Sequence, residues 1–451
     1  MKPREADSNR GAATSPGTDQ TPGSIFWREG VTPVPPGTAT QFITRLVGRL
    51  YLVASQWTER LTARVRGPAR PVRPAGSMRI LAVGPFYSEN WVAAHLHALG
   101  RTPEVQDIRV ITPEAYRPLP GVRYHIPPAW LRRLCGMSVA RACSALRLVF
   151  SERPDVVIGY HAPWNGVVSL LAGRLGKCRT AYFSVGGPAE IIGGGLYSEH
   201  ALFRRIGKEI PDLERRFLAL IDRFDSIITM GSGSAQWFRS AGISASIWPM
   251  GASVDGSAFS LNSASTGGTE KTWDFVTVAR LAPIKRLDLL IRAVAELRDQ
   301  GEARKAVIVG DGADRSRLET LLEETRLAGS VELAGFQSNV ESWLERSRLF
   351  VMTSASEGLP LAIIEAMLCG LPVVAPAVGD IPDLIVDGRN GFLFEPGDVG
   401  SCVEALRRAQ AVGDTGAMGR IAREHALAYT IEGRVPLWSE WLASQRVADT
   451  A

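Results

Sequence analysis

Residues 354–376 read SASEGLPLAIIEAMLCGLPVVAP, and this stretch decides how the second half of the chain is interpreted. It places an apolar strand end, a Gly-Leu-Pro step and an apolar helix in succession. Because proline is favoured at the first helical position, we predict a helix that begins at Pro360. The free N–H groups of its first turn would form an anion site. Glu365 would lie inside this helix beside Ile364, so its carboxylate requires a partner.

The two glutamates of this stretch suggest what that partner is. Glu357 lies in the loop before the helix, and Glu365 follows it by eight positions. Glu365 would lie roughly 7–8 Å along the axis from the helix start at 1.5 Å per residue. Carboxylates accept hydrogen bonds from vicinal hydroxyls, so we predict that Glu365 binds the ribose of a nucleotide and Glu357 a transferred sugar. The alternative is that Glu365 is a buried helix residue paired with an arginine.

Two cations and a glycine follow the neighbouring strands. Arg280 and Lys285 come after the predicted strand 274–278, and Gly310 comes after the next strand. The carboxyl ends of parallel strands share one sheet edge, where ligands bind, and both types of cation bind phosphate oxygens. We predict that Arg280 and Lys285 bind a diphosphate; the alternative is a pair of surface cations. Gly310 either lets a ligand approach the backbone or forms a tight turn.

Strands and helices alternate in two blocks, from residue 78 to about 250 and again from 274 onward. Near-continuous apolar strands between helices indicate parallel sheets covered on both faces. We predict an α/β fold of two doubly wound Rossmann-like domains, 78–254 and 255–431, that face each other across a cleft, with a helix at about 432–446 packed back on the first. The predicted strands are 79–84, 107–112, 155–159, 180–184, 226–230, 274–278, 305–309, 331–335, 349–353 and 372–375, and the predicted helices include 89–100 and 165–176.

The basic N-terminal segment differs from the rest of the chain. The formal net charge is +5, but residues 1–77 contain eleven Lys or Arg and five acids, so the remaining residues are close to neutral. We therefore expect no nucleic-acid partner for the globular part. Residues 1–40 are rich in Gly, Pro, Ser and Thr, which predicts disorder. Residues 41–66 show helical periodicity with a separate arginine face, which predicts a helix on an anionic membrane or one packed on the protein itself.

The cysteines and the N-terminus favour a cytoplasmic protein. The five cysteines show no CxxC spacing, so neither a disulfide framework nor a zinc site is expected. The N-terminal MKPREADSNRG lacks the apolar core of a secretion signal. No run of about 18 apolar residues occurs, so we expect no membrane-spanning helix.

Four ordered segments resemble one enzyme family: VARLAPIKRLDLLIRA, IVGDGADRSRLE, LAGFQSN, and the opening stretch with its continuation to EPGD. In this order they resemble the C-terminal half of retaining GT-B glycosyltransferases of family four, the glycosyl transferases group 1. The hallmark of that family is the Glu-x7-Glu element, formed here by Glu357 and Glu365. The resemblance is strong over 272–400, weaker over 78–255, and does not reach 1–77.

The resemblance implies a set of donor-site roles. Arg280 and Lys285 would neutralise the leaving diphosphate, and Glu357 and Glu365 would bind the donor hexose and the ribose. These cations and the helix N-terminus would replace the divalent ion of other glycosyltransferases, so neither a metal nor a cofactor is expected. The other implied donor-binding residues are Phe336 at the base pocket, Gly310 near the diphosphate, and Gly358, Leu359 and Leu361 near the sugar.

The first domain would bind the acceptor. The segment RPDVVIGYHAPWNG resembles the family's strand that ends in a histidine at the cleft, so His161 would contact the donor sugar and take part in catalysis; the alternative is a structural histidine. The first loop, GPFYSENWVAAH, lacks the family's Gly-Gly pair and carries Asn90 and Trp91 instead. Gly186 and Gly187, in another loop, are predicted to serve the acceptor together with Asn90 and Trp91.

The function implied by the resemblance is a retaining, metal-independent hexosyltransferase. It would move a hexose from a nucleotide-diphosphate sugar to a glycan or lipid-linked acceptor, in bacterial exopolysaccharide, lipopolysaccharide or glycolipid biosynthesis at the inner face of the cell membrane. One alternative is a catalytically inactive glycan- or nucleotide-binding paralogue, against which the intact Lys285 and Glu357 argue. The other is a dinucleotide-dependent oxidoreductase, against which the missing GxGxxG fingerprint argues.

Overall fold

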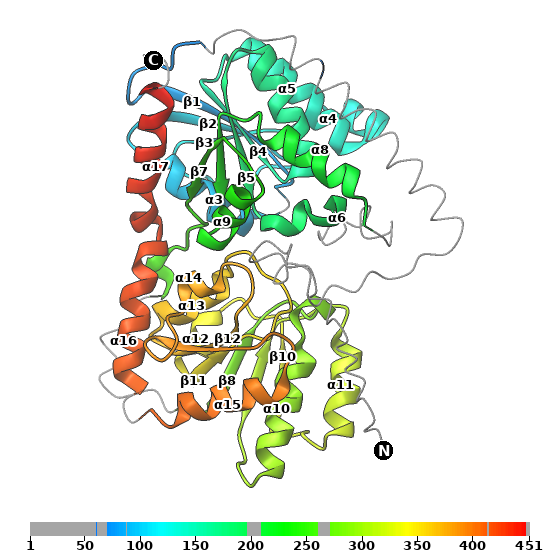
Figure 1. Ribbon diagram of the computed structural model, residues 1–451, viewed down its shortest axis with the longest axis vertical. Coiled ribbons are helices and arrows are strands. Elements are labelled where there is room, and N and C mark those ends of the chain that lie inside the picture. Colours follow the sequence, from blue (N-terminus) through cyan, green and yellow to red (C-terminus); the bar gives the residue numbers. More distant parts are fainter. Residues whose placement is uncertain are drawn as a thin grey trace, which may run out of the picture.

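The computed structural model describes residues 60, 70–86, 88–195, 209–259, 271–412 and 415–447. Apart from Arg60, the predicted helix at 41–66 lies outside the described residues, as does the segment 1–40. The described chain forms two parallel β-sheets, each flanked by helices and placed one above the other in Figure 1. The predicted α/β fold of two doubly wound domains is thereby confirmed.

The first sheet has seven parallel strands in the order β3-β2-β1-β4-β5-β6-β7. Their bounds are β1 Met78–Val83, β2 Val105–Ile111, β3 Val122–His125, β4 Val156–Tyr160, β5 Arg179–Ser184, β6 Ser226–Thr229 and β7 Ser246–Pro249. Every residue of the central strand β4 is buried, as expected for a parallel strand with helices on both faces. All these strands run the same way, so their carboxyl ends meet at one edge.

Helices cover both faces of this sheet. They are α3 Glu89–Gly100, α4 Ala129–Ser151, α5 Val167–Leu175, α6 Ile192–Gly195, α8 Pro211–Ile221 and α9 Ser232–Ser240, with the short helices η1 Ala162–Gly166 and η2 Gly187–Glu190. The α3 helix begins after Ser88, whose side-chain oxygen accepts a hydrogen bond from Trp91 N at 3.3 Å. This cap satisfies one of the free N–H groups of the first turn.

The second sheet has six parallel strands in the order β10-β9-β8-β11-β12-β13. The strands are β8 Trp273–Val278, β9 Ala306–Val309, β10 Val331–Gly335, β11 Ser347–Val351, β12 Val373–Pro376 and β13 Gly391–Phe394. The helices around it are α10 Leu287–Asp299, α11 Arg315–Glu324, α12 Val340–Glu345, α13 Leu361–Leu368, α14 Ile381–Leu384, α15 Val399–Gln410 and α16 Thr415–Ala426, with η3 Gly256–Phe259, η4 Pro283–Lys285 and η5 Leu427–Tyr429. As in the first sheet, the carboxyl ends of the strands share one edge.

The last helix, α17 (Ile431–Val447), leaves the second domain and packs on the first. In Figure 1, α17 runs along one side of the first domain and continues the line of α16, which lies along the second. The side chain of Trp441 is fully buried, and its Nε1 donates to Ser226 Oγ of β6 at 3.1 Å. Near the helix start, Arg101 and Glu432 form an ion pair at 2.7 Å. The C-terminal helix is therefore part of the first domain's core, although it follows the second domain in sequence.

The structure differs from the prediction in a few places. The sequence analysis omitted β3, β7 and β13, which all lie at sheet edges. The helix predicted to start at Pro360 begins at Leu361, and Pro360 is the residue before its first turn. Its φ of −75° and ψ of 117° are extended rather than helical. The loops that carry Lys285, Gly310 and Glu357 follow β8, β9 and β11.

Candidate active site

The candidate site lies where the strands of the second sheet end. After β8 the chain forms η4, which ends at Lys285, and after β11 it runs through a loop to α13. Two hydrogen bonds join these segments: Thr353 Oγ1 donates to Lys285 O at 3.0 Å, and Ala355 N donates to Ile284 O at 2.8 Å. They hold the backbone of Lys285 beside the loop that carries Glu357.

Lys285 and Glu357 form an ion pair at this edge of the sheet. Lys285 Nζ donates to Glu357 Oε1 at 2.6 Å, and the two side chains are 19% and 11% exposed. Because both are mostly removed from water, each compensates the charge of the other. An anion bound beside Lys285 would compete for the ammonium and would leave Glu357 able to accept hydrogen bonds from hydroxyls. Arg280, which follows β8, is exposed at the same edge.

Glu365 lies in the second turn of α13 between residues of the core. Its neighbours Ile364 and Ala366 are fully buried, and burial raises the pKa of Glu365 to about 7. Among the described residues, no side chain donates a hydrogen bond to its carboxylate and no arginine pairs with it. The alternative of an ion-paired helix residue is therefore wrong. A desolvated carboxylate without a protein partner is costly, so Glu365 is suited to a ligand that donates hydrogen bonds.

The start of α13 offers its first-turn amides toward the same edge. No side chain caps this helix. Ile363 N donates to Pro360 O at 3.2 Å. The amides of Leu361 and Ala362 are therefore the ones that depend on water or a ligand. Leu359 is buried just before the helix, whereas Leu361 is partly exposed in its first turn. The amides of this turn and the Lys285 ammonium together provide positive charge for an anion.

Gly310 has a structural reason to be glycine. A Cβ at Gly310, whose φ is +138°, would lie 1.9 Å from Ala279 O, and one at Gly312 would lie 2.2 Å from Leu281 O. Gly310 N already donates to Gly335 O at 2.8 Å. The tight-turn interpretation therefore accounts for Gly310, whose amide is engaged within the protein. Phe336 follows the edge strand β10, and its side chain is 78% exposed, so its ring is open to a planar ligand.

On the first domain, His161 is held by a glutamate that the sequence analysis did not select. Nδ1 of His161 lies 2.7 Å from Glu190 Oε1. The buried carboxylate of Glu190 also accepts hydrogen bonds from Gly186 N at 2.6 Å and from Tyr182 OH at 2.8 Å. With Glu190 as a carboxylate, which only accepts, this contact requires the proton of the His161 ring to be on Nδ1. His161 has a φ of 66°, which is unfavourable for a residue with a Cβ, so the fold imposes this position.

The other predicted acceptor residues lie around His161. The Trp91 ring stacks on His95 with centroids 4.1 Å apart and lies 6.0 Å from the ring of His161. Trp91 thus belongs to an aromatic cluster that borders the histidine. Asn90, one residue earlier in α3, is exposed. Gly187 has a φ of 61° at the start of η2. It directly follows Gly186, whose N–H donates to Glu190.

The two groups of residues meet across the domain interface. A Cβ at Gly358 would lie 2.7 Å from Val185 O. Gly358 follows Glu357, and Val185 precedes Gly186. The loop of the Lys285–Glu357 pair is therefore in contact with the loop of the His161–Glu190 pair. Only a glycine fits this contact, because any side chain at position 358 would collide with the facing backbone.

Carboxylates of the second domain cap a helix of the first domain beside this contact. Asp380 accepts hydrogen bonds from Ser234 N at 2.9 Å and from Ser234 Oγ at 2.7 Å. Asp383 accepts from the backbone N and Oγ of Ser232. Both serines lie in the first turn of α9, whose N–H groups require acceptors. Burial raises the pKa of Asp380 to about 7, against the lowering effect of the Ser234 bonds.

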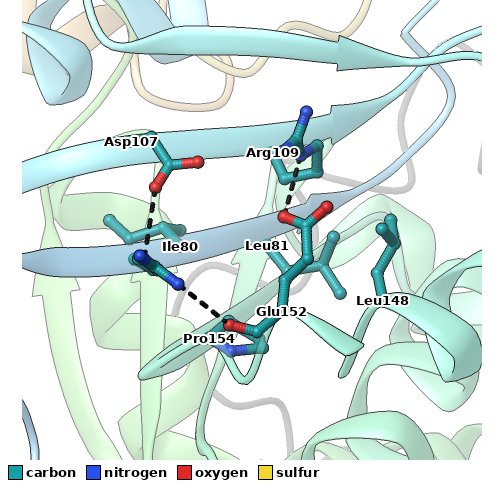
Figure 2. A pocket seen from close by; sticks show the side chains of 8 residues that line it. Ile80, Leu81, Asp107, Arg109, Leu148, Glu152 and Pro154 are labelled. Atoms are coloured by element: carbon teal, nitrogen blue, oxygen red, sulfur yellow. Dashed lines mark hydrogen bonds and ion pairs between the residues drawn. The ribbon is translucent and has the colours of Figure 1, made fainter. Parts of the chain in front are cut away.

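A recess elsewhere on the first domain is not part of this site. It lies beside β1 and β2 and is lined by Arg79, Asp107, Arg109 and Glu152, of which Figure 2 labels the last three. These charges pair with one another: Arg109 Nε lies 3.0 Å from Glu152 Oε2, and Arg79 Nε lies 3.8 Å from Asp107 Oδ1. Arg79 is near the amino end of β1, away from the carboxyl ends where ligands bind. In the described part of the chain, no group of three or more His, Cys, Asp or Glu residues could hold a metal ion.

The sequence of the second domain is similar to that of known glycosyltransferases. Residues 260–414 match the family described as glycosyl transferases group 1. The chain is 33% identical over 141 residues to the putative colanic acid biosynthesis glycosyltransferase WcaL of Escherichia coli. The matched region is 30% of this chain and 35% of that protein. The chain is also 39% identical over 158 residues to the sulfoquinovosyl transferase SQD2 of Arabidopsis thaliana. This matched region is 34% of the chain and 30% of SQD2. The chain thus matches about a third of the length of each relative.

The fold of nearly the whole described chain is similar to solved structures. Sucrose-phosphate synthase from Thermosynechococcus elongatus has a TM-score of 0.66 at 15% identity, which covers 82% of this chain and 100% of that chain. Anabaena HepE, solved in complex with UDP and glucose, has a TM-score of 0.63 at 20% identity, with the same coverage of 82% and 100%. These likenesses show that the chain has the GT-B fold.

Proposed function

Because residues 260–414 match the family of glycosyl transferases group 1, we propose that this chain transfers a hexose from a nucleotide-diphosphate sugar to a glycan or lipid-linked acceptor. The observation that carries the proposal is the unpartnered carboxylate of Glu365 beside the Lys285–Glu357 pair. An ammonium, free helix amides and a carboxylate that lacks a donor match the phosphates and the ribose of a nucleotide. The GT-B neighbours solved with UDP support this choice of ligand class.

In the proposed complex, the diphosphate binds between Lys285 and the amino end of α13. The ribose diol donates hydrogen bonds to Glu365, and the hexose hydroxyls donate to Glu357 once Lys285 turns toward phosphate. The exposed Arg280 adds a second positive charge at this edge, and Phe336 offers its open ring to the base. These groups stabilise the negative charge that develops on the leaving group, so the proposed reaction is independent of a metal ion.

The proposed transfer exchanges one C–O bond for another. The bond between the anomeric carbon and the diphosphate oxygen breaks, and the acceptor hydroxyl oxygen bonds to the anomeric carbon. The acceptor proton passes to the departing phosphate oxygen. We propose that the acceptor enters and reacts from the same side as the leaving group, with retention of configuration. His161, oriented by Glu190, would donate or accept hydrogen bonds at the sugar from the facing domain.

We further propose a role in cell-surface polysaccharide or glycolipid synthesis at the cytoplasmic side of the membrane. Two relatives are a putative colanic acid biosynthesis enzyme and an amylovoran biosynthesis glycosyltransferase. A nucleotide sugar is a cytoplasmic metabolite, and a chain whose five cysteines are all unpaired is compatible with a reducing compartment.

A panel of nucleotide sugars tests the proposed function. Purified protein is screened for thermal stabilisation by UDP-, GDP- and ADP-sugars, and the stabilising donor is then assayed for release of the nucleoside diphosphate. We expect Lys285→Ala to lower the release rate by about 100-fold or more, the scale seen when a group that stabilises transition-state charge is removed. Lys305→Ala is the matched control, because Lys305 is exposed before β9, at the opposite edge of the same sheet.

Three outcomes would contradict the proposal. Stabilisation by no member of the panel would refute the nucleotide-sugar site. Binding of the nucleotide without release or transfer at any acceptor would favour the inactive paralogue. Equal rates for the wild type and Lys285→Ala would remove the assigned role of the lysine.

A further inference from the structure

The exposed apolar side chains of the first domain are concentrated around one helix. Of the large hydrophobic residues that are exposed in the described part of the chain, Trp130 and Leu134 of α4 have 66% and 77% of their surface exposed. Ile126, just before the helix, Val139, within it, and Trp164 of η1 are also exposed. We call Ile126, Trp130, Leu134, Val139 and Trp164 the α4 surface.

A kink in α4 explains why these side chains are not buried. Gly136 has a φ of 76° and a ψ of 168°, which interrupts the helix. Beyond the kink, Ala145, Leu148 and Val149 are buried against the first sheet. Before it, Trp130 and Leu134 are four residues apart and therefore lie on one face of the helix. That face remains exposed.

The α4 surface is continuous with the η1 segment that begins beside His161. Trp164 Nε1 donates to Ser138 O at 3.2 Å, which joins η1 to α4 just after the kink. Trp164 is three residues after His161. In Figure 1, α4 lies on the side of the first domain away from α17. The apolar side chains thus form a surface next to the acceptor half of the candidate site.

The charge close to this surface is mainly positive, although Arg117 is paired with Glu89 of α3 at 3.1 Å. Residues 115–151 contain six arginines and no aspartate or glutamate, in a chain with 46 acids among its 451 residues. Arg123 and Arg133 are exposed close to Ile126 and Leu134. An apolar surface with a rim of arginines is complementary to an anionic lipid headgroup layer over acyl chains.

We propose that the α4 surface docks on an anionic membrane, with Trp130 and Leu134 inserted at the interface. Tryptophan is favoured at the boundary between headgroups and hydrocarbon, and arginine binds lipid phosphate through its planar fork. The same charge disfavours two other occupants. Residues 41–66 of this chain carry five arginines and one glutamate, and a second copy would present its own arginines.

The surface lies on the membrane and does not cross it. By length and composition, α4 is the one helix of the described residues that could span a bilayer. About a third of its apolar 18-residue stretch is buried in the protein. It also contains four arginines. One face of its second half, with Ala145, Leu148 and Val149, is buried in the domain core. This anchors α4 to the protein as an interfacial element, so only its first turns and their neighbours would enter the lipid.

Docking at this place would set the class of acceptor, a step that rests on the proposed function. A soluble glycan reaches the site from water, whereas an acceptor anchored in lipid must be met at the bilayer. A membrane surface adjoining η1 would bring a lipid-anchored hydroxyl to the His161 side of the interface. We therefore assign the acceptor to the lipid-linked class.

Vesicle flotation with the full chain tests the docking surface. We expect the wild type to float with phosphatidylcholine vesicles containing about a third phosphatidylglycerol, and to float much less with pure phosphatidylcholine. The double variant Trp130→Ser/Leu134→Ser should reduce the vesicle affinity about tenfold or more, because it removes the two most exposed apolar anchors. The matched control Val386→Ser removes an exposed apolar side chain of the second domain, which is 45% exposed, and should bind as the wild type does.

A second variant keeps the test decisive if the double variant misfolds. Arg133→Glu reverses an exposed charge and leaves the apolar residues intact, and it should also weaken binding to the anionic vesicles. Residues 41–66 are unchanged in every variant, so their own contribution cancels. Release of nucleoside diphosphate in solution should be unaffected by these variants, which separates failure of docking from failure of the proposed function.

Several results would overturn the docking proposal. Equal flotation of the wild type and both α4 variants would show that the surface does not contact the membrane. Equal binding to neutral and anionic vesicles would remove the role of the arginines. A wild type that is dimeric by light scattering, together with a monomeric Trp130→Ser/Leu134→Ser variant, would assign the surface to a second copy.

Discussion

Replacing Glu365 by glutamine should change stability and nucleotide affinity in opposite directions. In the unfolded chain this carboxyl ionises near pH 4.5, whereas in the folded protein burial raises its pKa to about 7. Between these values the native state holds a proton that the unfolded state has lost. The free energy of unfolding therefore falls as the pH rises through this window, and the loss is complete above about pH 7.

The size of the effect follows from the difference between the two pKa values. A difference of 2.5, from 4.5 to about 7, corresponds to about 3–4 kcal/mol at 1.4 kcal/mol for each pKa unit. Glutamine carries no charge at any pH. We expect Glu365→Gln to leave stability unchanged near pH 4.5 and to increase it by up to about 3–4 kcal/mol at pH 8. The buried Asp380 titrates in the same range, but it contributes equally to both proteins.

The same substitution should weaken nucleotide binding. A ribose diol that donates to the ionised carboxylate would favour the charged form, so nucleotide binding should release a proton from the wild type between pH 6 and 7. Glu365→Gln should release none at this residue and should lose about 1–3 kcal/mol of affinity for the nucleoside diphosphate, as expected for hydrogen bonds to a charged group. The substitution would thus lower the nucleotide affinity and raise the free energy of unfolding.

Two assays measure these quantities. Urea unfolding at pH 5 and pH 8 gives the stability difference, and titration calorimetry in two buffers of different ionisation enthalpy gives the number of protons released. Glu404→Gln is the control, since Glu404 is an exposed residue in the middle of α15. Equal stability of wild type and Glu365→Gln at pH 8, or an unchanged nucleotide affinity, would refute the reasoning.

Three further substitutions test other parts of the site. Glu190→Gln should lower the transfer rate about tenfold or more because the His161 tautomer is no longer fixed, and should alter the pH profile of kcat. Asp380→Ala should reduce the free energy of unfolding by about 1–3 kcal/mol, since it leaves the polar groups of Ser234 without their acceptor; urea denaturation measures this. Phe336→Ala should raise KM for the nucleotide sugar by an amount worth about 0.5–1.5 kcal/mol without lowering Tm, because its side chain is exposed.

Each of these has a result that contradicts it. An unchanged kcat and pH profile for Glu190→Gln would assign the glutamate a purely structural role. A stability of Asp380→Ala equal to the wild type would show that water replaces the lost carboxylate. A Phe336→Ala enzyme with normal KM would place the base elsewhere.

Hydrophobic patterning predicted the interior strands and the edge strand β10, but it missed the other three edge strands. Central strands such as β4 and β9 are entirely buried and read as continuous apolar runs. The omitted strands β3, β7 and β13 are edge strands of four residues each. Strand β3 reads VRYH and β7 contains a proline, which are features of strands with one unpaired side. Sequence periodicity is weak where only half of a strand's surface is covered.

The predictability of the site also depended on local context. Glu357 and Glu365 stand out because a proline-led apolar helix surrounds them, and Lys285 because it follows a strand. Their ion pairing could not be predicted, since it depends on how two loops meet. Glu190 was missed because its partner His161 is 29 positions away. One signal was available: Glu190 is the single charged residue between positions 180 and 198.

The course of α17 has a consequence for how the protein is made. Trp438 and Trp441 complete the core of the first domain, yet they are synthesised only after the whole second domain. While the second domain is being synthesised, the part of the first domain that contacts α17 lacks these two side chains and remains incompletely packed. A translation stop or proteolytic cut near residue 430 would leave the amino-terminal half without its closing helix, so partial products should be recognised by chaperones and degraded.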